Sequence, residues 1–341
     1  KLPFKRTLGA TGRMPSLPSH FLPNYTDQSK ADALFHYTTA AGLIGILTSG
    51  QIWSTAYYCT NDESELTTGQ GVLRPLFYQE AHRLREAGDR RVQIFANRGV
   101  DIDHYADQFE KAISGNALSH LCTYITCFFR PSAKEEFLHG LLSQWRAYGS
   151  DGGYALHFNR SKMQEALDSF GDGESIEYNL QDIHYSPDNS LKEDVLGHKG
   201  AFLAAFHEYL DDLAEPLTFE SRSRRNPIYG LNGGPLEAYL SYISHTKNLH
   251  FAEERETRLS ITQFVPAKKG CQPVSYFNRD GLVVPYVKSP LDRLDILDCL
   301  EWVVVGPGPR MHARFKAVTQ LIRQLGRNIE VRASHIPFTR Q

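Results

Sequence analysis

The sequence has few cysteines, no long apolar run and almost no net charge. Its five cysteines are odd in number and form no C-x-x-C pair. This argues against a zinc cage or a disulfide framework and predicts reduced thiols in the cytoplasm. No apolar stretch reaches the roughly 18 residues of a membrane span, so we expect no membrane partner. The formal net charge of -2 gives no overall attraction to nucleic acid and leaves only a local basic patch for that role.

Familiar nucleotide and metal motifs are missing as well. The chain contains no G-x-G-x-x-G, no Walker A loop and no H-E-x-x-H. Asn61, Asp62 and Glu65 carry oxygen ligands, but their spacing matches no EF-hand loop. A helix N-cap is the better interpretation of Asn61 or Asp62, and we expect no metal cofactor.

The sequence does contain enough apolar material for a large core, because 41% of its 341 residues are hydrophobic. Residues 1–30 are rich in Pro, Ser, Gly and Thr and lack periodicity, which predicts an irregular arm. From 31 to 341, alternating and helical patterns are interspersed, which predicts a single α+β domain with a mostly helical insertion at about 191–250. The predicted strands lie at 33–39, 51–56, 121–130, 152–159, 175–186, 254–264, 301–308 and 329–337.

The stretch "LFHYTTAAGLIGILTSG" changes from a strand pattern to a helix pattern. In a strand, His36 and Thr38 face one side while Phe35 and Tyr37 face the other. An imidazole and a hydroxyl on one face can hold a polar ligand such as a ribose. The same spacing also fits a hydrogen-bonded core histidine beside an ordinary strand threonine.

A second polar group lies in "FAEERETRLSI". If this segment is extended, Glu254, Glu256 and Arg258 project from one face. Adjacent carboxylates raise one another's pKa, and an arginine within reach offsets part of that effect. The alternative is a solvated helix end, in which Arg258 pairs with Glu254 four residues away.

A third group, formed by Trp145, Arg146 and Tyr148, precedes a glycine-rich turn. Its side chains suit a stacking wall and a phosphate clamp. The alternative is that Trp145 and Tyr148 are anchors of the core.

Taken in order, these segments resemble a mainly bacterial domain-of-unknown-function family, over residues 33 to 338. The matching motifs are His36-Tyr37-Thr38, "ILTSGQIW", Asn61-Asp62 with Glu65, Cys127-Phe128, Trp145 with Tyr148, "GGYALHF", Glu254/Glu256/Arg258, Gly306-Pro307 and "SHIP". More distantly, the first motifs and the late glutamates are similar to DarT-type DNA ADP-ribosyltransferases and to the diphtheria-toxin and PARP-like fold. The chain lacks the S-T-S motif of arginine-specific toxins, although "WSTAYY" occupies a similar place.

The resemblance implies an ADP-ribosyltransferase-like split β-sheet core with helical insertions, and NAD as the substrate. His36 and Thr38 would then bind the adenosine side of NAD. Tyr57 or Tyr58 would stack on nicotinamide.

The resemblance also implies roles for the second and third groups. Trp145 and Tyr148 would line the cofactor site, and Arg146 or Arg258 would neutralise the pyrophosphate.

The two glutamates would carry the chemistry. Glu256 would stabilise the oxocarbenium-like transition state of glycosidic cleavage, and Glu254 would orient or activate the acceptor.

The resemblance thus implies an NAD-dependent ADP-ribosyltransferase that modifies a nucleic acid or a protein. A bacterial toxin or phage-defence effector, controlled by a regulatory partner or antitoxin, fits this activity. The basic run "SRSRRNP", with Arg222, Arg224 and Arg225, suits phosphate contacts and equally suits a solvated loop.

Three alternatives stay open. The first is a non-catalytic module that binds or senses a nucleotide, and the second is an NAD glycohydrolase with water as the acceptor. The third is a metal-dependent, nuclease-like enzyme that uses Asp62, Glu65, Glu254 and Glu256.

Overall fold

The computed structural model of the chain describes residues 26–60, 73–149, 152–169, 176–186, 199–215, 234–264, 271–289 and 295–337. Within these residues the protein is a mixed α+β structure, as the sequence predicts. The predictions that lie outside the described residues concern Asn61, Asp62, Glu65, the basic run at Arg222, Arg224 and Arg225, and residues 1–25 of the arm.

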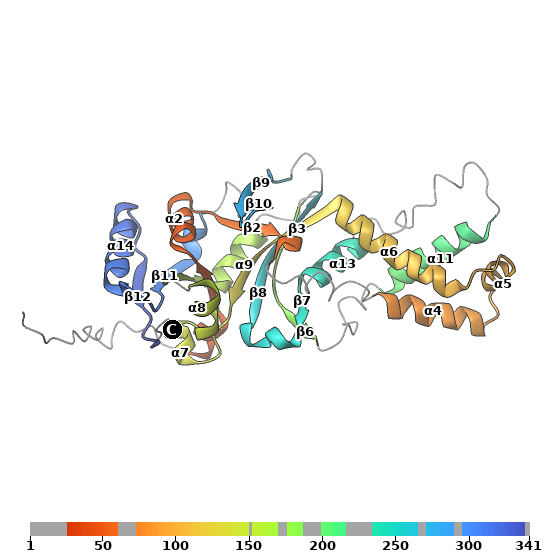
Figure 1. Cartoon of the computed structure of the whole chain (residues 1–341), viewed down its shortest axis with the longest axis horizontal. Coiled ribbons are helices and arrows are strands. Elements are labelled where there is room, and N and C mark those ends of the chain that lie inside the picture. The colour runs from red at the N-terminus through yellow and green to blue at the C-terminus, as the bar shows by residue number, and fades with distance from the viewer. Residues whose placement is uncertain are drawn as a thin grey trace, which may run out of the picture.

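A mixed sheet forms the centre of the molecule (Figure 1). In chain order, the strands are β1 (Ala33–Thr38), β2 (Ile52–Ala56), β3 (Leu121–Phe129), β4 (Tyr154–Asn159), β5 (Ile176–Asp182), β6 (His184–Ser186), β7 (Thr246–Asn248), β8 (Glu256–Phe264), β9 (Ser275–Arg279), β10 (Leu282–Ser289), β11 (Leu300–Val305) and β12 (Glu330–Ala333). The main path is β12-β11-β4-β1-β3-β2-β10-β9, with β8 also on β3 and β5 on β8. β11 and β12 are parallel, whereas the other pairs of this sheet are antiparallel.

Helices cover the sheet and extend beyond one end of it (Figure 1). The helices are α1 (Asp27–Ala31), α2 (Ala40–Ser49), α4 (Arg74–Glu86), α5 (Arg90–Asn97), α6 (Ile102–His120), α7 (Lys134–His139), α8 (Leu142–Tyr148), α9 (Arg160–Asp168), α11 (Lys199–Ala214), α13 (Gly234–Ser244) and α14 (Met311–Gln324). Short 3-10 helices in the described part of the chain are η2 (Tyr57–Cys59), η3 (Leu249–Glu254) and η4 (Ile296–Cys299).

Strand β3 carries different neighbours along one edge. Its whole length pairs with β8 on one side. On the other side, Phe129 pairs with Phe35 of β1, whereas Ile125 pairs with Thr55 of β2. Strands β1 and β2 therefore diverge between these two points, and the sheet splits there.

The helix after β1 packs behind the sheet as its pattern predicts. Leu43, Ile46 and Leu47 are the buried residues of α2. The side chain of Thr39 caps the N-terminus by accepting from Gly42 N at 3.3 Å. Gly50, at φ 66°, ends the helix in the left-handed conformation that glycine adopts without strain.

Helices α4, α5, α6, α11 and α13 form a second body, which we call the helical lobe (Figure 1). Its core contains the three ring pairs formed by Phe77, Phe109 and Phe206. The predicted insertion at 191–250 supplies only part of this lobe, because residues 74–120 contribute α4, α5 and α6. Tyr57 and Ile125 join the same core and connect the lobe to the sheet.

Two local elements differ from the sequence analysis. The arm predicted to be irregular through residue 30 ends earlier, because Thr26 caps α1 by accepting from Ser29 N at 3.0 Å. The β9–β10 hairpin, for which the pattern gave no prediction, turns at Asp280 and Gly281, with φ of 51° and 90°. Positive φ at both positions is what the type I′ turn of a two-residue hairpin requires.

Candidate functional site

A cavity of about 690 Å³ lies where β1 and β2 diverge along β3, and we call it the site cavity. Its wall combines residues from β1, β2, β3, α8, β7, η3, β8 and β9. Segments as far apart in the sequence as Phe35 and Asp280 therefore meet there. The volume is in the range of ordinary ligand and cofactor pockets.

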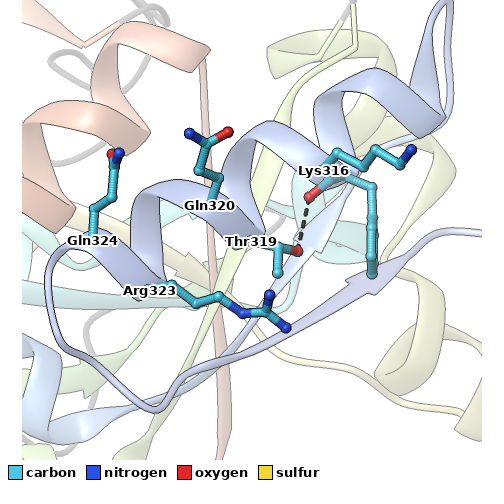
Figure 2. Close-up of a pocket in the computed structure, with 6 residues that line it drawn as sticks. Lys316, Thr319, Gln320, Arg323 and Gln324 are labelled. Carbon is cyan, nitrogen blue, oxygen red and sulfur yellow. Dashed lines mark hydrogen bonds between the residues drawn. The ribbon is translucent and has the colours of Figure 1, made fainter.

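A second hollow, of about 500 Å³, lies along α14 (Figure 2). Its lining residues are Phe315, Lys316, Thr319, Gln320, Arg323 and Gln324. They project from successive turns of one helix, and the hydrogen bond drawn in Figure 2 joins Thr319 Oγ1 to the carbonyl of Phe315 at 2.9 Å. None of the predicted site residues lies there, so the site cavity is the candidate site.

Two glutamates, a lysine and an arginine form a cluster of charges in the site cavity. Arg258 Nε lies 2.6 Å from Glu256 Oε1, and Arg258 Nη2 lies 3.3 Å from Glu256 Oε2. Lys247 Nζ lies 2.7 Å from Glu254 Oε2 and 3.2 Å from Glu256 Oε2. Glu256 and Arg258 are only 4% and 2% exposed. We call these four residues the charged cluster.

Glu256 is ionised at neutral pH. Burial alone raises its pKa, but the charges of Arg258 and Lys247 and hydrogen bonds from Arg258 and the Cys127 thiol lower the pKa from 4.5 to about 2. A carboxylate fixed in its charged form inside a cavity is suited to stabilise positive charge that develops during a reaction.

The backbone explains why the two glutamates have different surroundings. Glu254 ends η3, and Arg255 then adopts a left-handed conformation with φ 43° and ψ 47°. Strand β8 begins only at Glu256. The predicted extended spacing therefore holds for Glu256 and Arg258 but not for Glu254. Glu254 lies near Glu256 because both carboxylates form an ion pair with Lys247.

His36 faces the site cavity from β1. Its Nδ1 lies 3.1 Å from the carbonyl oxygen of Cys127, a bond that places the proton on Nδ1 and leaves Nε2 as an acceptor. Burial lowers the pKa of His36 more than this hydrogen bond raises it. The ring is therefore neutral at pH 7 and offers a lone pair to a ligand hydroxyl.

Aromatic side chains face the site cavity from α8 and β2. Tyr148 is 43% exposed, and burial of its hydroxyl together with the nearby negative charges raises its pKa to about 12. Trp53 is 45% exposed and stacks on Tyr286, with ring centroids 4.2 Å apart. Both residues present a flat apolar face and suit a planar ring.

The structure thus brings several of the predicted residues together. The predicted residues that line the site cavity are His36, Tyr148, Glu254, Glu256 and Arg258. The alternative of a solvated helix end for "FAEERETRLSI" is wrong, because Glu256 and Arg258 lie in β8 and are buried.

Other predicted residues lie outside the lining of the site cavity. Trp145 is 1% exposed, and its indole Nε1 donates to the carbonyl of His139 at 2.9 Å, so its position is that of a core anchor. Arg146 is exposed on α8. Thr38 packs against Gly42, where an added Cβ would collide with its hydroxyl.

The two tyrosines predicted to stack on nicotinamide also lie apart from the cavity lining. Directly after β2, η2 turns the chain so that Tyr57 enters the core of the helical lobe, where it is 5% exposed. Tyr58 is 47% exposed beside the thiol of Cys122. The aromatic residue that β2 does present to the cavity is Trp53.

Sequence reasoning left out Lys247, Trp53 and Arg279 as site residues, although all three line the cavity. The alternation of "QIWSTA" gave a signal for Trp53, because it shares a face of β2 with Thr55 and not with the buried Ser54. No local pattern identifies Lys247, because its position depends on the pairing of β6 with β7.

Comparison with protein families gives a match for part of this chain. Residues 144–259 match the model of a family described as a protein of unknown function (DUF2971). The matched range contains Tyr148 and the charged cluster, and it begins after β1, β2 and β3. Comparisons with curated proteins and with solved structures gave no match.

Two further observations concern the residues that the structure describes. Among them, no group of three or more His, Cys, Asp or Glu side chains is arranged to hold a metal ion. No helix in this part of the chain has the length and apolar character needed to cross a membrane.

Proposed function

We propose that the site cavity binds NAD and that the chain is an NAD-dependent ADP-ribosyltransferase with a nucleic acid or protein acceptor. The observation that carries this proposal is the ionised Glu256 in a cavity at the split of the sheet, with His36 lining the same cavity from β1, on the other side of β3. The distant similarity of the H-Y-T opening and the late glutamates to DarT-type and PARP-like enzymes supports the same reaction and a related split-sheet fold.

In this reaction the bond between nicotinamide nitrogen and ribose C1′ breaks, and nicotinamide leaves with the electron pair. Positive charge develops on the ribose, and the Glu256 carboxylate stabilises it. An acceptor oxygen or nitrogen then bonds to C1′, and Glu254, which is less buried, takes up the acceptor's proton.

The remaining lining residues bind the substrate. His36 Nε2 accepts from a ribose hydroxyl, and Trp53 and Tyr148 contact planar rings. The guanidinium of Arg258 donates from Nε to Glu256 and from Nη1 to the carbonyl oxygen of Ser244, the latter at 2.6 Å. Arg258 therefore holds Glu256 in place. Arg279, which lines the cavity from β9, supplies the cation for the pyrophosphate.

A second function, a non-catalytic nucleotide-binding module, is favoured by one observation. Both oxygens of Glu256 already accept hydrogen bonds from Arg258 or Lys247. A network of this kind can have a purely structural role, which is to stabilise the wall of the site cavity. NAD would then bind without being consumed.

Nicotinamide release from NAD tests the proposal. The proteins compared are the wild type, Glu256→Gln and Glu253→Gln, each with and without DNA, RNA and cell lysate. Glu253 is an exposed neighbour outside the cavity lining and is the matched control. We expect Glu256→Gln to lower release by about 10²–10³-fold, the usual cost of losing one transition-state contact, and Glu253→Gln to leave it unchanged.

Labelled NAD separates the remaining outcomes. Label that becomes attached to one added acceptor supports the transferase and identifies its substrate class. Release without attachment indicates an NAD glycohydrolase. Binding of NAD without any release, with all proteins folded, contradicts the catalytic proposal and favours the binding module.

A further inference from the structure

Lys247 is a buried lysine in the wall of the site cavity. It lies on β7, which pairs with β6 in a two-stranded parallel sheet that brings Tyr185 opposite Lys247. Lys247 is only 7% exposed. A buried ammonium is unfavourable unless carboxylates lie within ion-pair distance, so its placement depends on its two acidic partners.

The ammonium of Lys247 joins two carboxylates that the backbone separates. Its distances to Glu254 Oε2 and Glu256 Oε2 are 2.7 and 3.2 Å. The left-handed Arg255 between the two glutamates ends the regular alternation. Because like charges repel in a buried site, a single ammonium between them offsets the cost of holding both carboxylates ionised.

Lys247 also fixes the orientation of the Glu256 carboxyl group. Oε1 accepts from Arg258 Nε at 2.6 Å, so Arg258 holds one side of the group tightly. On Oε2, Arg258 Nη2 lies at 3.3 Å and Lys247 Nζ at 3.2 Å. The other titratable groups near Glu256 are Glu254, Cys127, Tyr148, Tyr185 and His245.

We propose that Lys247 is a positioning residue that holds Glu254 and Glu256 around one ammonium, so that both carboxylates face the cavity in a fixed arrangement. The consequence for the reaction rests on the proposed function, which assigns Glu256 to the ribose and Glu254 to the acceptor. The pairing of the charges does not depend on that assignment. Without the ammonium, the two carboxylates repel each other, retain a proton to higher pH and lose their common orientation.

The kinetic test compares Lys247→Met, Lys247→Arg and the control Lys111→Met. Lys111 forms an exposed ion pair with Asp107 on α6, away from the site cavity. We expect Lys247→Met to lower kcat for nicotinamide release by at least about tenfold with little change in KM, as for a contact used in the transition state. The acidic limb of the pH profile moves to higher pH, and Lys247→Arg restores most of kcat. Equal kcat and pH profiles in Lys247→Met and the wild type would overturn the proposal.

A second readout needs no NAD. Carbon-13 NMR of the glutamate carboxyl groups in the full chain follows the titration of Glu256, assigned with Glu256→Gln. We expect this titration to move to higher pH in Lys247→Met and to stay near its wild-type position in Lys247→Arg and Lys111→Met. An unchanged titration in Lys247→Met refutes the pairing. If the wild type releases no nicotinamide, the proposed function fails while this titration still decides the role of Lys247.

A third measurement applies if Lys247→Met does not fold. In the wild type, the nitrogen-15 resonance of the Lys247 amine is expected to respond to the titration of both glutamates. In Glu254→Gln, which changes the more exposed of the two partners, one of these two responses is expected to disappear. An amine resonance that follows neither carboxylate overturns the proposal.

Discussion

Replacing Trp145 with alanine should destabilise the protein strongly, because the structure places this indole in the core. Trp145 is 1% exposed and packs edge-to-face on Tyr37, with ring centroids 4.8 Å apart. Its Nε1 donates to the carbonyl of His139 at 2.9 Å. Gly140 and Gly306 lie so close to the indole that a Cβ at either position would lie within 3 Å of it. The surroundings are therefore closely fitted to the full ring.

The magnitude follows from these contacts. Removing a buried aromatic ring costs about 3–5 kcal/mol because of lost transfer energy and the cavity left behind. The carbonyl of His139 loses its donor, which adds about 1 kcal/mol if water cannot reach it. We expect a loss of about 4–6 kcal/mol in the free energy of unfolding of Trp145→Ala.

Urea denaturation followed by circular dichroism measures this loss, and Trp53→Ala is the matched control. Trp53 is 45% exposed, so we expect its replacement to cost less than about 1.5 kcal/mol, in line with surface substitutions that lose one stacking contact. A loss below about 1.5 kcal/mol in Trp145→Ala, with a change in NAD affinity instead, would refute the core placement and return Trp145 to the binding site.

Two further predictions concern ligand binding and pH. Trp145 and Trp302 are only 1% and 4% exposed, whereas Trp53 faces the site cavity. We therefore expect NAD to quench tryptophan fluorescence in the wild type and not in Trp53→Phe. Equal quenching in both proteins would remove Trp53 from the binding site. Acid should destabilise the fold, because burial lowers the pKa of His245 from 6.5 to about 4. The unfolded chain then takes up this proton first, and about 3 kcal/mol of stability is lost as pH falls from 6.5 to 4. The midpoints of urea denaturation, measured between pH 6.5 and 4, should fall less steeply in His245→Gln than in the wild type. His250→Gln, at an exposed position, is the control and should behave like the wild type. Parallel curves for all three proteins would contradict the role of His245.

Local patterns predicted most of the individual strands and helices. The alternation around His36 gave β1, and the spacing of Leu43, Ile46 and Leu47 gave the buried face of α2. The alternation after Glu256 gave β8. These elements are specified by neighbouring residues, so a single sequence is sufficient to identify them.

The assembly of the site could be predicted only in part. Glu256 and Arg258 share a strand face, which spacing shows, and both line the site cavity. The positions of Lys247 and Trp53 depend on which strands pair and where β3 changes neighbours. Such pairings join residues far apart in the chain, and spacing along the sequence contains no information about them.

The same limit explains the difference for Tyr57. The resemblance to ADP-ribosyltransferases implied that Tyr57 or Tyr58 stacks on nicotinamide. The turn at η2 redirects Tyr57 into the helical lobe, whose core is built largely from α4, α5, α6, α11 and α13. That core could not be inferred before the lobe itself was known.

The end of α13 has a consequence for any attempt to dissect the chain into fragments. Tyr239, Leu240 and Ile243 anchor this helix in the core of the helical lobe, and its last residue, Ser244, accepts from Arg258 through its carbonyl oxygen. A fragment without the lobe would deprive a buried guanidinium of an acceptor at the negative end of a helix. We therefore expect a fragment that lacks the lobe to be less stable than the whole chain.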